Sequence, residues 1–225
     1  MEGNELFPVF IKLHTLHTLV VGGGLVGLEK INTLLTNSPS ARLTIVALQV
    51  DPEIRAMAET YSNVVIYERA FCEEDLTEVE LVVAATNNQE LNQQIRVAAK
   101  KRRLLVNFAD KPDLCDFYLG SVVKKGDLKI AISTNGKSPT IAKRLKEILN
   151  ESLPQELDTT LQQMAALRNR LEGNFTDKVK KLNQVTSLLV EEQPDFAKHD
   201  HKKWLIANIL ILSLAIALAV IIFKS

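Results

Sequence analysis

Strand-like and helix-like runs alternate over the first 110 residues, and this alternation predicts an α/β fold with a Rossmann-like parallel sheet. A glycine turn, Gly22-Gly23-Gly24, joins the first strand-like run to the first helical run, where such sheets bind ligands. After residue 112 the pattern changes to two short strands and a helix, a small α+β region. A helical C-terminal region and one long apolar segment complete the chain.

The expected strands are short apolar runs, the first of them rich in β-branched residues, and the expected helices have apolar residues three and four positions apart. The expected strands are residues 17–22, 41–48, 64–67, 80–85 and 104–108. The helices expected between them are residues 25–37, 52–61 and 89–103. Strands and helices in this order predict parallel units with right-handed crossovers.

The α+β region is predicted as two strands, 117–124 and 127–134, joined by a turn at Gly126. Ser138 is expected to cap the following helix, 139–152, with Pro139 at its first position. A polar helical stretch over 155–190 is broken at Gly173 and Asn174. The predicted divisions of the chain are 1–112, 113–153, 154–198 and 204–223.

The last of these divisions is the most apolar part of the sequence. Residues 205–223 carry no charge, and 17 of the 19 are aliphatic or Phe. A helix of this length spans roughly 28 Å, close to the hydrocarbon core of a bilayer. The segment predicts a C-terminal transmembrane helix over 204–223; the alternative is a buried core helix. Lys202 and Lys203 before it favour a single-pass anchor at the cytoplasmic face of the cell membrane.

Composition excludes several classes of protein. The chain has 225 residues, with 27 Lys and Arg balanced by 27 Asp and Glu, which argues against a nucleic-acid partner. The hydrophobic fraction of 46 % excludes a disordered chain. Cys72 and Cys115 form no CxxC motif, so they fit a reducing compartment and predict no metal site.

Residues 22–27 match the G-x-G-x-x-G pattern that binds dinucleotides. Gly22 permits a tight turn, Gly24 lets the backbone approach a pyrophosphate, and Gly27 lets the helix pack close to the sheet. The alternative is a glycine turn without a ligand. An acid that would hold the ribose is missing after the second strand, where Asp51 comes late. The residues alone therefore leave open whether the ligand is NAD.

Two further polar groups follow predicted strands at the same edge of the sheet. Thr86, Asn87 and Asn88 either contact a ligand or form a turn in which Asn88 caps the next helix. Asp110 is either a proton acceptor in the cleft or a turn aspartate, and the residues alone favour the turn.

Several motifs in order resemble the precorrin-2 dehydrogenase / sirohydrochlorin ferrochelatase family, the NAD-dependent module of sirohaem synthase. The resemblance covers about residues 6 to 155 and rests on LFPVFIKL, VVGGGLVGLEK, AATNNQELNQQI and LVNFADKPDLCDFYLGSVVKKGDLKIAISTNGKSP. LFPVFIKL is similar to the opening strand of the family. The absence of an acid after the second strand is usual in this family.

The resemblance implies oxidation of precorrin-2 to sirohydrochlorin with NAD, followed in bifunctional members by insertion of ferrous iron. It implies that Asp110 is catalytic and that Ser133 lies near the tetrapyrrole. It also implies a homodimer formed through the α+β region. The residues expected to bind NAD are Gly22, Gly23, Gly24, Leu25, Val26, Thr86, Asn87 and Asn88.

The substrate that this resemblance implies is a polycarboxylate macrocycle, which requires cations around its cleft. Lys111, Lys137 and Arg144 lie in the segments expected to surround it; for Arg144 the alternative is a solvated helix face. Two other functions are weighed against the bifunctional enzyme. One is a dehydrogenase without chelatase activity, and the other is a membrane-tethered module that senses nucleotides and regulates a partner.

Overall fold

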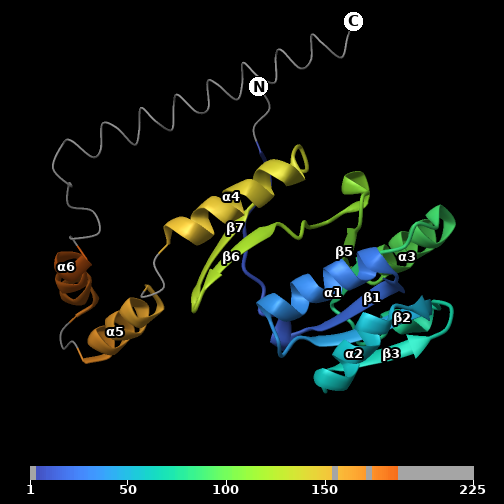
Figure 1. Ribbon diagram of the computed structural model, residues 1–225, viewed down its shortest axis with the longest axis horizontal. Coiled ribbons are helices and arrows are strands. Elements are labelled where there is room, and N and C mark those ends of the chain that lie inside the picture. Colours follow the sequence, from blue (N-terminus) through green and yellow to red (C-terminus); the bar gives the residue numbers. More distant parts are fainter. Residues whose placement is uncertain (1–3, 154–156, 171–173, 187–225) are drawn as a thin grey trace, which may run out of the picture. The chain divides into compact units, whose positions relative to one another are not determined.

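A computed structural model describes residues 4–153, 157–170 and 174–186. Five parallel strands form a sheet in the order β3-β2-β1-β4-β5, which confirms the predicted Rossmann-like sheet (Figure 1). The strands are β1 (His17–Gly23), β2 (Arg42–Val50), β3 (Val64–Glu68), β4 (Leu81–Ala84) and β5 (Leu105–Phe108). The expected strands agree with these apart from a few residues at their ends.

Helices cover both faces of this sheet, and side chains that alternate along each strand form two cores. Ile31 of α1 and Ile54 of α2 share one core with Val20. Ile95 of α3 shares the other core with Leu19. The helices are α1 (Leu25–Asn37), α2 (Pro52–Thr60) and α3 (Gln89–Lys101). All five of these apolar side chains have no exposed surface, so the sheet is a firm support for the loops at its ends.

The strand order reverses beside β1. Successive strands run outward from β1 to β2 and β3, and the chain then returns to place β4 on the other side of β1. Ligands of open α/β sheets bind at such a point, outside the carboxyl ends of the strands. The glycine turn follows β1 and the Thr86–Asn88 turn follows β4, so both lie at this position.

The segment that resembles an opening strand forms no strand. Residues 6–12 have no regular structure, and the helical turn η1 (Leu13–Thr15) follows them. Phe7 is 86 % exposed and Phe10 is 70 % exposed. The expectation of a strand is therefore wrong for this single chain, because these side chains have no apolar surface against them.

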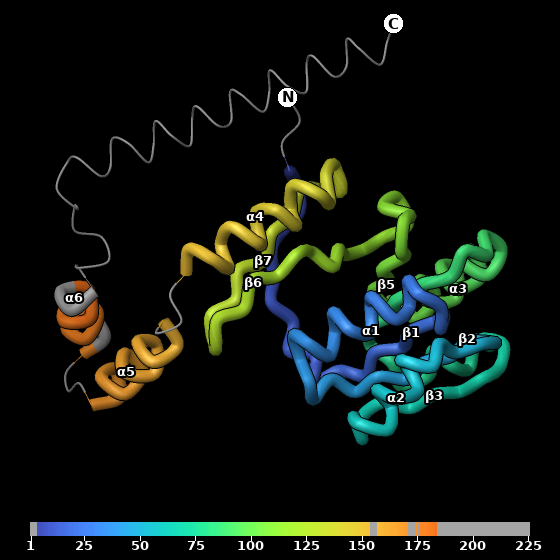
Figure 2. The backbone as a smooth tube through the Cα atoms, in the orientation of Figure 1, coloured from blue at the N-terminus to red at the C-terminus, as the bar shows by residue number. Residues whose placement is uncertain are grey.

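The α+β region is an antiparallel hairpin packed against a helix (Figure 2). Its strands are β6 (Ser121–Lys125) and β7 (Leu128–Ile132), and its helix is α4 (Pro139–Ser152). Gly126 forms the turn with a φ of +55°. Ser138 accepts a hydrogen bond at Oγ from the backbone N–H of Ile141 at 3.2 Å, which confirms the predicted cap. Both strands are shorter than expected.

Two further helices follow, α5 (Leu157–Arg170) and α6 (Phe175–Thr186). Asn174 accepts a hydrogen bond at Oδ1 from the backbone N–H of Asp177 at 2.9 Å, so the residue expected to break the helical stretch begins α6. The chain divides into two compact units, residues 1–158 and 159–225. The other helical turns of the first unit are η2 (Glu73–Leu76) and η3 (Pro112–Leu114).

The predicted fold class needs one correction. Among the residues that the structure describes, no helix is long and apolar enough to cross a membrane. The predicted transmembrane segment, 204–223, lies outside the described residues. The C-terminal transmembrane helix, and with it the location at the cytoplasmic face of the membrane, are therefore withdrawn from the description of this fold.

Candidate active site

The glycine turn has the geometry that its sequence predicts. Gly22 has a φ of +118°, a conformation that residues with a Cβ rarely adopt. A Cβ on Gly22 would collide with the carbonyl oxygen of Ala85, and one on Gly27 would collide with the carbonyl oxygen of Gly22. Both glycines therefore serve close packing of the chain against itself.

Gly24 differs from its neighbours, because a Cβ added there meets nothing within 4 Å. It stands at the N-cap of α1 without a side-chain cap, and the first turn of α1 contains no acidic residue. The first N–H groups of a helix have no intrahelical acceptor, and the helix dipole adds partial positive charge. The turn is thus an open cradle whose donors fit a pyrophosphate. The residues present therefore fit NAD.

Asp51 is committed to another task. Its Oδ1 accepts a hydrogen bond from the backbone N–H of Glu53 at 2.9 Å and caps α2. Its own backbone N–H donates to the carbonyl oxygen of Gly23 at 2.8 Å, which ties the end of β2 to the glycine turn. The late aspartate after the second strand thus shapes the site through its backbone.

The turn after β4 is built mainly by its own polar side chains. Asn88 accepts a hydrogen bond at Oδ1 from the backbone N–H of Leu91 at 3.0 Å and caps α3. This cap was one of the two predicted alternatives for Asn88. Thr86 accepts at Oγ1 from the backbone N–H of Asn88 at 3.0 Å. Asn87 is exposed, and no hydrogen bond joins its side chain to the described residues. Of the three, Asn87 has the side chain that is most available to a ligand.

Asn92 is a residue that the sequence reasoning did not single out. It is 3 % exposed, and its Nδ2 donates to the carbonyl oxygen of Thr86 at 2.9 Å. Its Oδ1 has no hydrogen-bond partner among the described residues. A signal was present, because Ile95 and Ala99 on the same side of α3 are buried and a polar residue on that side needs a partner.

Asp110 lies beyond the carboxyl end of β5 in a left-handed conformation, with a φ of +58°. Its side chain is exposed, and within the described part of the chain no hydrogen bond or ion pair engages its carboxylate. Aspartate tolerates this conformation better than most residues. The turn that the residues alone favoured is therefore real, and it leaves the carboxylate free for chemistry.

Cys115 holds the loop that carries Asp110. Its Sγ accepts a hydrogen bond from the backbone N–H of Phe108 at 3.1 Å. The same sulfur donates to the carbonyl oxygen of Lys111 at 3.3 Å. Burial raises the pKa of the Cys115 thiol, so the sulfur keeps its proton and remains a donor. Asn107 adds a hydrogen bond from Nδ2 to the carbonyl oxygen of Phe117 at 2.8 Å.

Asp116 completes this support. It accepts hydrogen bonds from the backbone N–H of Val106 at 3.0 Å and from Arg96 at 2.5 Å. The Arg96 guanidinium lowers the pKa of the Asp116 carboxyl, and burial opposes that shift. A charged pair thus links α3 to the segment after the Asp110 loop.

Backbone hydrogen bonds bring these segments to one edge of the sheet. Ala85 donates to the carbonyl oxygen of Val21 at 2.8 Å, and Ala109 donates to that of Ala84 at 2.9 Å. The glycine turn, the Thr86–Asn88 turn and the Asp110 loop therefore follow neighbouring strands β1, β4 and β5. This arrangement unites the predicted nucleotide residues with the predicted catalytic residue.

The residues expected to bind substrate are all exposed. Lys111 follows Asp110, whereas Ser133, Lys137 and Arg144 belong to the α+β region. The Oγ of Ser133 accepts from the backbone N–H of Asn135 at 3.2 Å, which shapes the loop after β7. No described hydrogen bond or ion pair joins these four side chains to the nucleotide edge, so their roles stay predictions.

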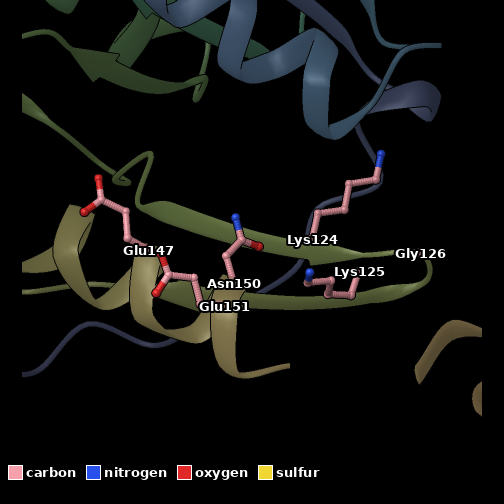
Figure 3. A pocket seen from close by; sticks show the side chains of 6 residues that line it. All are labelled: Lys124, Lys125, Gly126, Glu147, Asn150 and Glu151. Atoms are coloured by element: carbon pink, nitrogen blue, oxygen red, sulfur yellow. The ribbon is translucent and has the colours of Figure 1, made fainter. Parts of the chain in front are cut away.

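A depression of about 490 Å³ lies elsewhere, between β6 and α4 (Figure 3). It contains none of the predicted site residues; it is lined by Lys124, Lys125, Gly126, Glu147, Asn150 and Glu151. Both charge signs are present and the depression is open to solvent. We locate the chemistry at the carboxyl edge of the sheet instead, since strand topology and the open glycine cradle coincide there.

Comparison with known proteins assigns the chain to a family. A family model described as "Putative NAD(P)-binding" matches residues 9–121, and one described as "Sirohaem biosynthesis protein central" matches residues 125–152. The solved structure of SirC, precorrin-2 dehydrogenase, superposes with a TM-score of 0.65 and 30 % identity, covering 80 % of this chain and 89 % of that one. The chain belongs to the precorrin-2 dehydrogenase family.

Longer proteins named siroheme synthase are also similar to this chain. The siroheme synthase of Psychromonas ingrahamii is 37 % identical over 168 residues, which are 75 % of this chain and 35 % of that protein. The siroheme synthase of Mannheimia succiniciproducens is 36 % identical over 151 residues, 67 % of this chain and 31 % of that protein. The chain spans about a third of the length of these relatives.

Proposed function

We propose that this protein oxidises precorrin-2 to sirohydrochlorin with NAD. The observation that carries the proposal is that an open glycine cradle and the Asp110 carboxylate, which has no partner among the described residues, lie at the same carboxyl edge of one sheet. Membership of the precorrin-2 dehydrogenase family supports the choice of substrate.

The chain would hold NAD through Gly22, Gly23, Gly24, Leu25, Val26, Thr86, Asn87 and Asn88. When bound, NAD supplies a hydride acceptor. Donors at the start of α1 would bind the pyrophosphate, and the Asn87 amide is free to contact the rest of the nucleotide. The reaction removes a hydride and a proton from precorrin-2, and yields sirohydrochlorin, NADH and the proton.

Asp110 would accept that proton. Its carboxylate has no competing partner among the described residues, and the bonds of Cys115 and Asn107 hold its loop at the end of β5. Lys111 beside it, with Lys137 and Arg144 from the α+β region, would bind the carboxylates of the macrocycle. Ser133 would lie near the same ligand.

The second proposed step is insertion of ferrous iron, with iron as a substrate. Within the described residues no three His, Cys, Asp or Glu side chains gather as metal ligands. The four ring nitrogens of sirohydrochlorin supply the ligands, and two N–H protons leave as iron enters. Asp110 would accept protons in this step as well.

We also propose a homodimer. The α4 helix exposes apolar side chains along one stripe, namely Ile141, Leu145 and Ile148, at 43 %, 41 % and 57 %. The N-terminal segment exposes Phe7 and Phe10 as well. A second copy of the chain is the partner that we expect to cover them. Ile148→Glu should shift sedimentation toward the monomer; an unchanged dimer would remove this helix from the interface.

The activity is tested with precorrin-2 and NAD under anaerobic conditions, following NADH and the sirohydrochlorin spectrum. Asp110→Asn keeps a residue that tolerates the left-handed backbone but removes the proton acceptor. Asp113→Asn, an exposed aspartate in the same loop, is the matched control. We expect the rate to fall at least a hundredfold for Asp110→Asn only.

Three results separate the alternatives. Loss of both NADH formation and metal insertion in Asp110→Asn supports the bifunctional enzyme. NADH formation without metal insertion above the uncatalysed rate reduces the proposal to a dehydrogenase. Intact NAD binding without turnover in the unmodified protein contradicts the proposed enzymatic activity and favours a nucleotide-sensing module.

A further inference from the structure

Two lysines of the β6–β7 hairpin reach the C-terminal end of α1. Lys129 donates from Nζ to the carbonyl oxygen of Asn37 at 2.5 Å, and Lys124 donates to that of Thr36 at 3.3 Å. Figure 3 shows the Lys124 side chain leaving its strand toward the blue segment above the hairpin. The two bonds join positions 92 and 88 residues apart in the sequence.

The two lysines are direct neighbours across the hairpin, because their Cα atoms are partners in the antiparallel register. Like charges placed directly opposite each other destabilise a pair of strands. The end of α1 compensates for this repulsion, since the C-terminus of a helix carries about half a negative charge and free carbonyl groups. The lysine pair is therefore unfavourable within the hairpin and favourable against the helix.

The positively charged groups at the C-terminal end of α1 come from the hairpin. The last turn of this helix contains no basic residue of its own. Two carbonyls are satisfied locally, that of Thr33 by the Asn37 side chain at 2.9 Å and that of Leu34 by the N–H of Ser38 at 2.8 Å. The carbonyls of Thr36 and Asn37 receive the lysines instead.

We propose that Lys124 and Lys129 form a lysine clamp that positions the two ligands for hydride transfer. The α1 helix begins at the turn proposed to bind NAD, and β7 leads into the loop of Ser133 and Lys137, proposed to contact the tetrapyrrole. The clamp fixes the hairpin on the far end of the nucleotide helix, and hydride transfer depends steeply on that spacing. The inference rests on the proposed function.

The test compares two variants. One carries both Lys124→Met and Lys129→Met, and the other carries Lys125→Met alone. Lys125 is the matched control, because neighbouring residues of a strand point to opposite faces and no described bond joins its side chain to α1. In the double variant we expect kcat/KM for precorrin-2 to fall about tenfold, while the KM for NAD changes less than twofold. Lys129→Arg, which keeps a charged donor, should retain most of the activity.

Hydrogen exchange gives a second measurement that needs no turnover. Amides of residues 34–38 and 121–131 should exchange faster in the double variant and not in Lys125→Met. If the double variant does not fold, the exposed Lys124→Met alone carries the test, with a smaller change of the same kind. Faster exchange in a protein without dehydrogenase activity would keep the clamp and contradict the proposed function. Equal behaviour of the double variant and Lys125→Met would overturn the clamp.

Discussion

The nucleotide edge and the α+β region of this protein are built by different means. Backbone geometry makes the nucleotide edge, where Gly22 packs against Ala85 and main-chain bonds join the ends of β1, β2, β4 and β5. Long side chains join the α+β region to the end of α1, through Lys124 and Lys129. Its hairpin and helix bury few apolar side chains, chiefly Val123 and Ala142. The first region is thus set by its own core, and the second depends on distant contacts.

The largest expected effect separates two kinds of glycine at the nucleotide edge. Gly22→Ala forces a Cβ into a backbone carbonyl at a positive φ, and should lower the free energy of unfolding by about 3 kcal/mol. Gly24→Ala puts its Cβ into open space, so stability should stay within about 0.5 kcal/mol. Urea denaturation measures both.

NAD titration of the same pair sharpens the contrast. The open space at Gly24 is where we expect the pyrophosphate, so Gly24→Ala should weaken NAD binding about tenfold without loss of stability. Unchanged NAD affinity in this variant would contradict the cradle. If the Gly22→Ala variant is as stable as the parent, the backbone at this position adapts to the added Cβ.

An intermediate effect concerns the ion pair beside the Asp110 loop. Asp116→Asn should lower the free energy of unfolding by about 1–2 kcal/mol at pH 7, because it removes the charged partner of Arg96. The Asp116 side chain is 27 % exposed. Arg96 lowers the folded-state pKa of Asp116, so this stabilisation is present above the ordinary pKa of aspartate and is lost as pH falls through the lowered pKa. The stability difference between parent and variant in urea denaturation should therefore shrink as pH falls below the ordinary pKa of aspartate, and should vanish below the lowered pKa.

The smallest effects compare one helix cap from each region. Asn88→Ala and Ser138→Ala should each cost about 1 kcal/mol, since each removes one side-chain acceptor from a helix start. Only Asn88→Ala should also weaken NAD binding, because its turn borders the cradle. Thermal unfolding with and without NAD measures this, and equal losses of NAD stabilisation in both variants would count against separate roles.

Sequence reasoning performed best where structure is local. The alternation of strands and helices, the tight turn at Gly22 and the Ser138 cap all depend on residues within a few positions of each other. It failed for residues 6–12, since a strand needs a neighbour and sequence does not show whether one exists. Asn92 escaped notice because its task is a hydrogen bond to the turn that precedes its own helix.

The order of elements, the glycine turn and the family resemblance were determined by the sequence alone, because they depend on short-range patterns. Only the tertiary structure decided which polar groups are engaged: Asp51 and Asn88 cap helices, whereas no hydrogen bond or ion pair from the described residues engages the Asp110 carboxylate. It also decided that two lysines face the end of α1. The two caps are local bonds, and the residues alone left the Asn88 cap as one of two alternatives. The lysine contacts join segments 88 and 92 residues apart, so they form only when the sheet and the hairpin have folded.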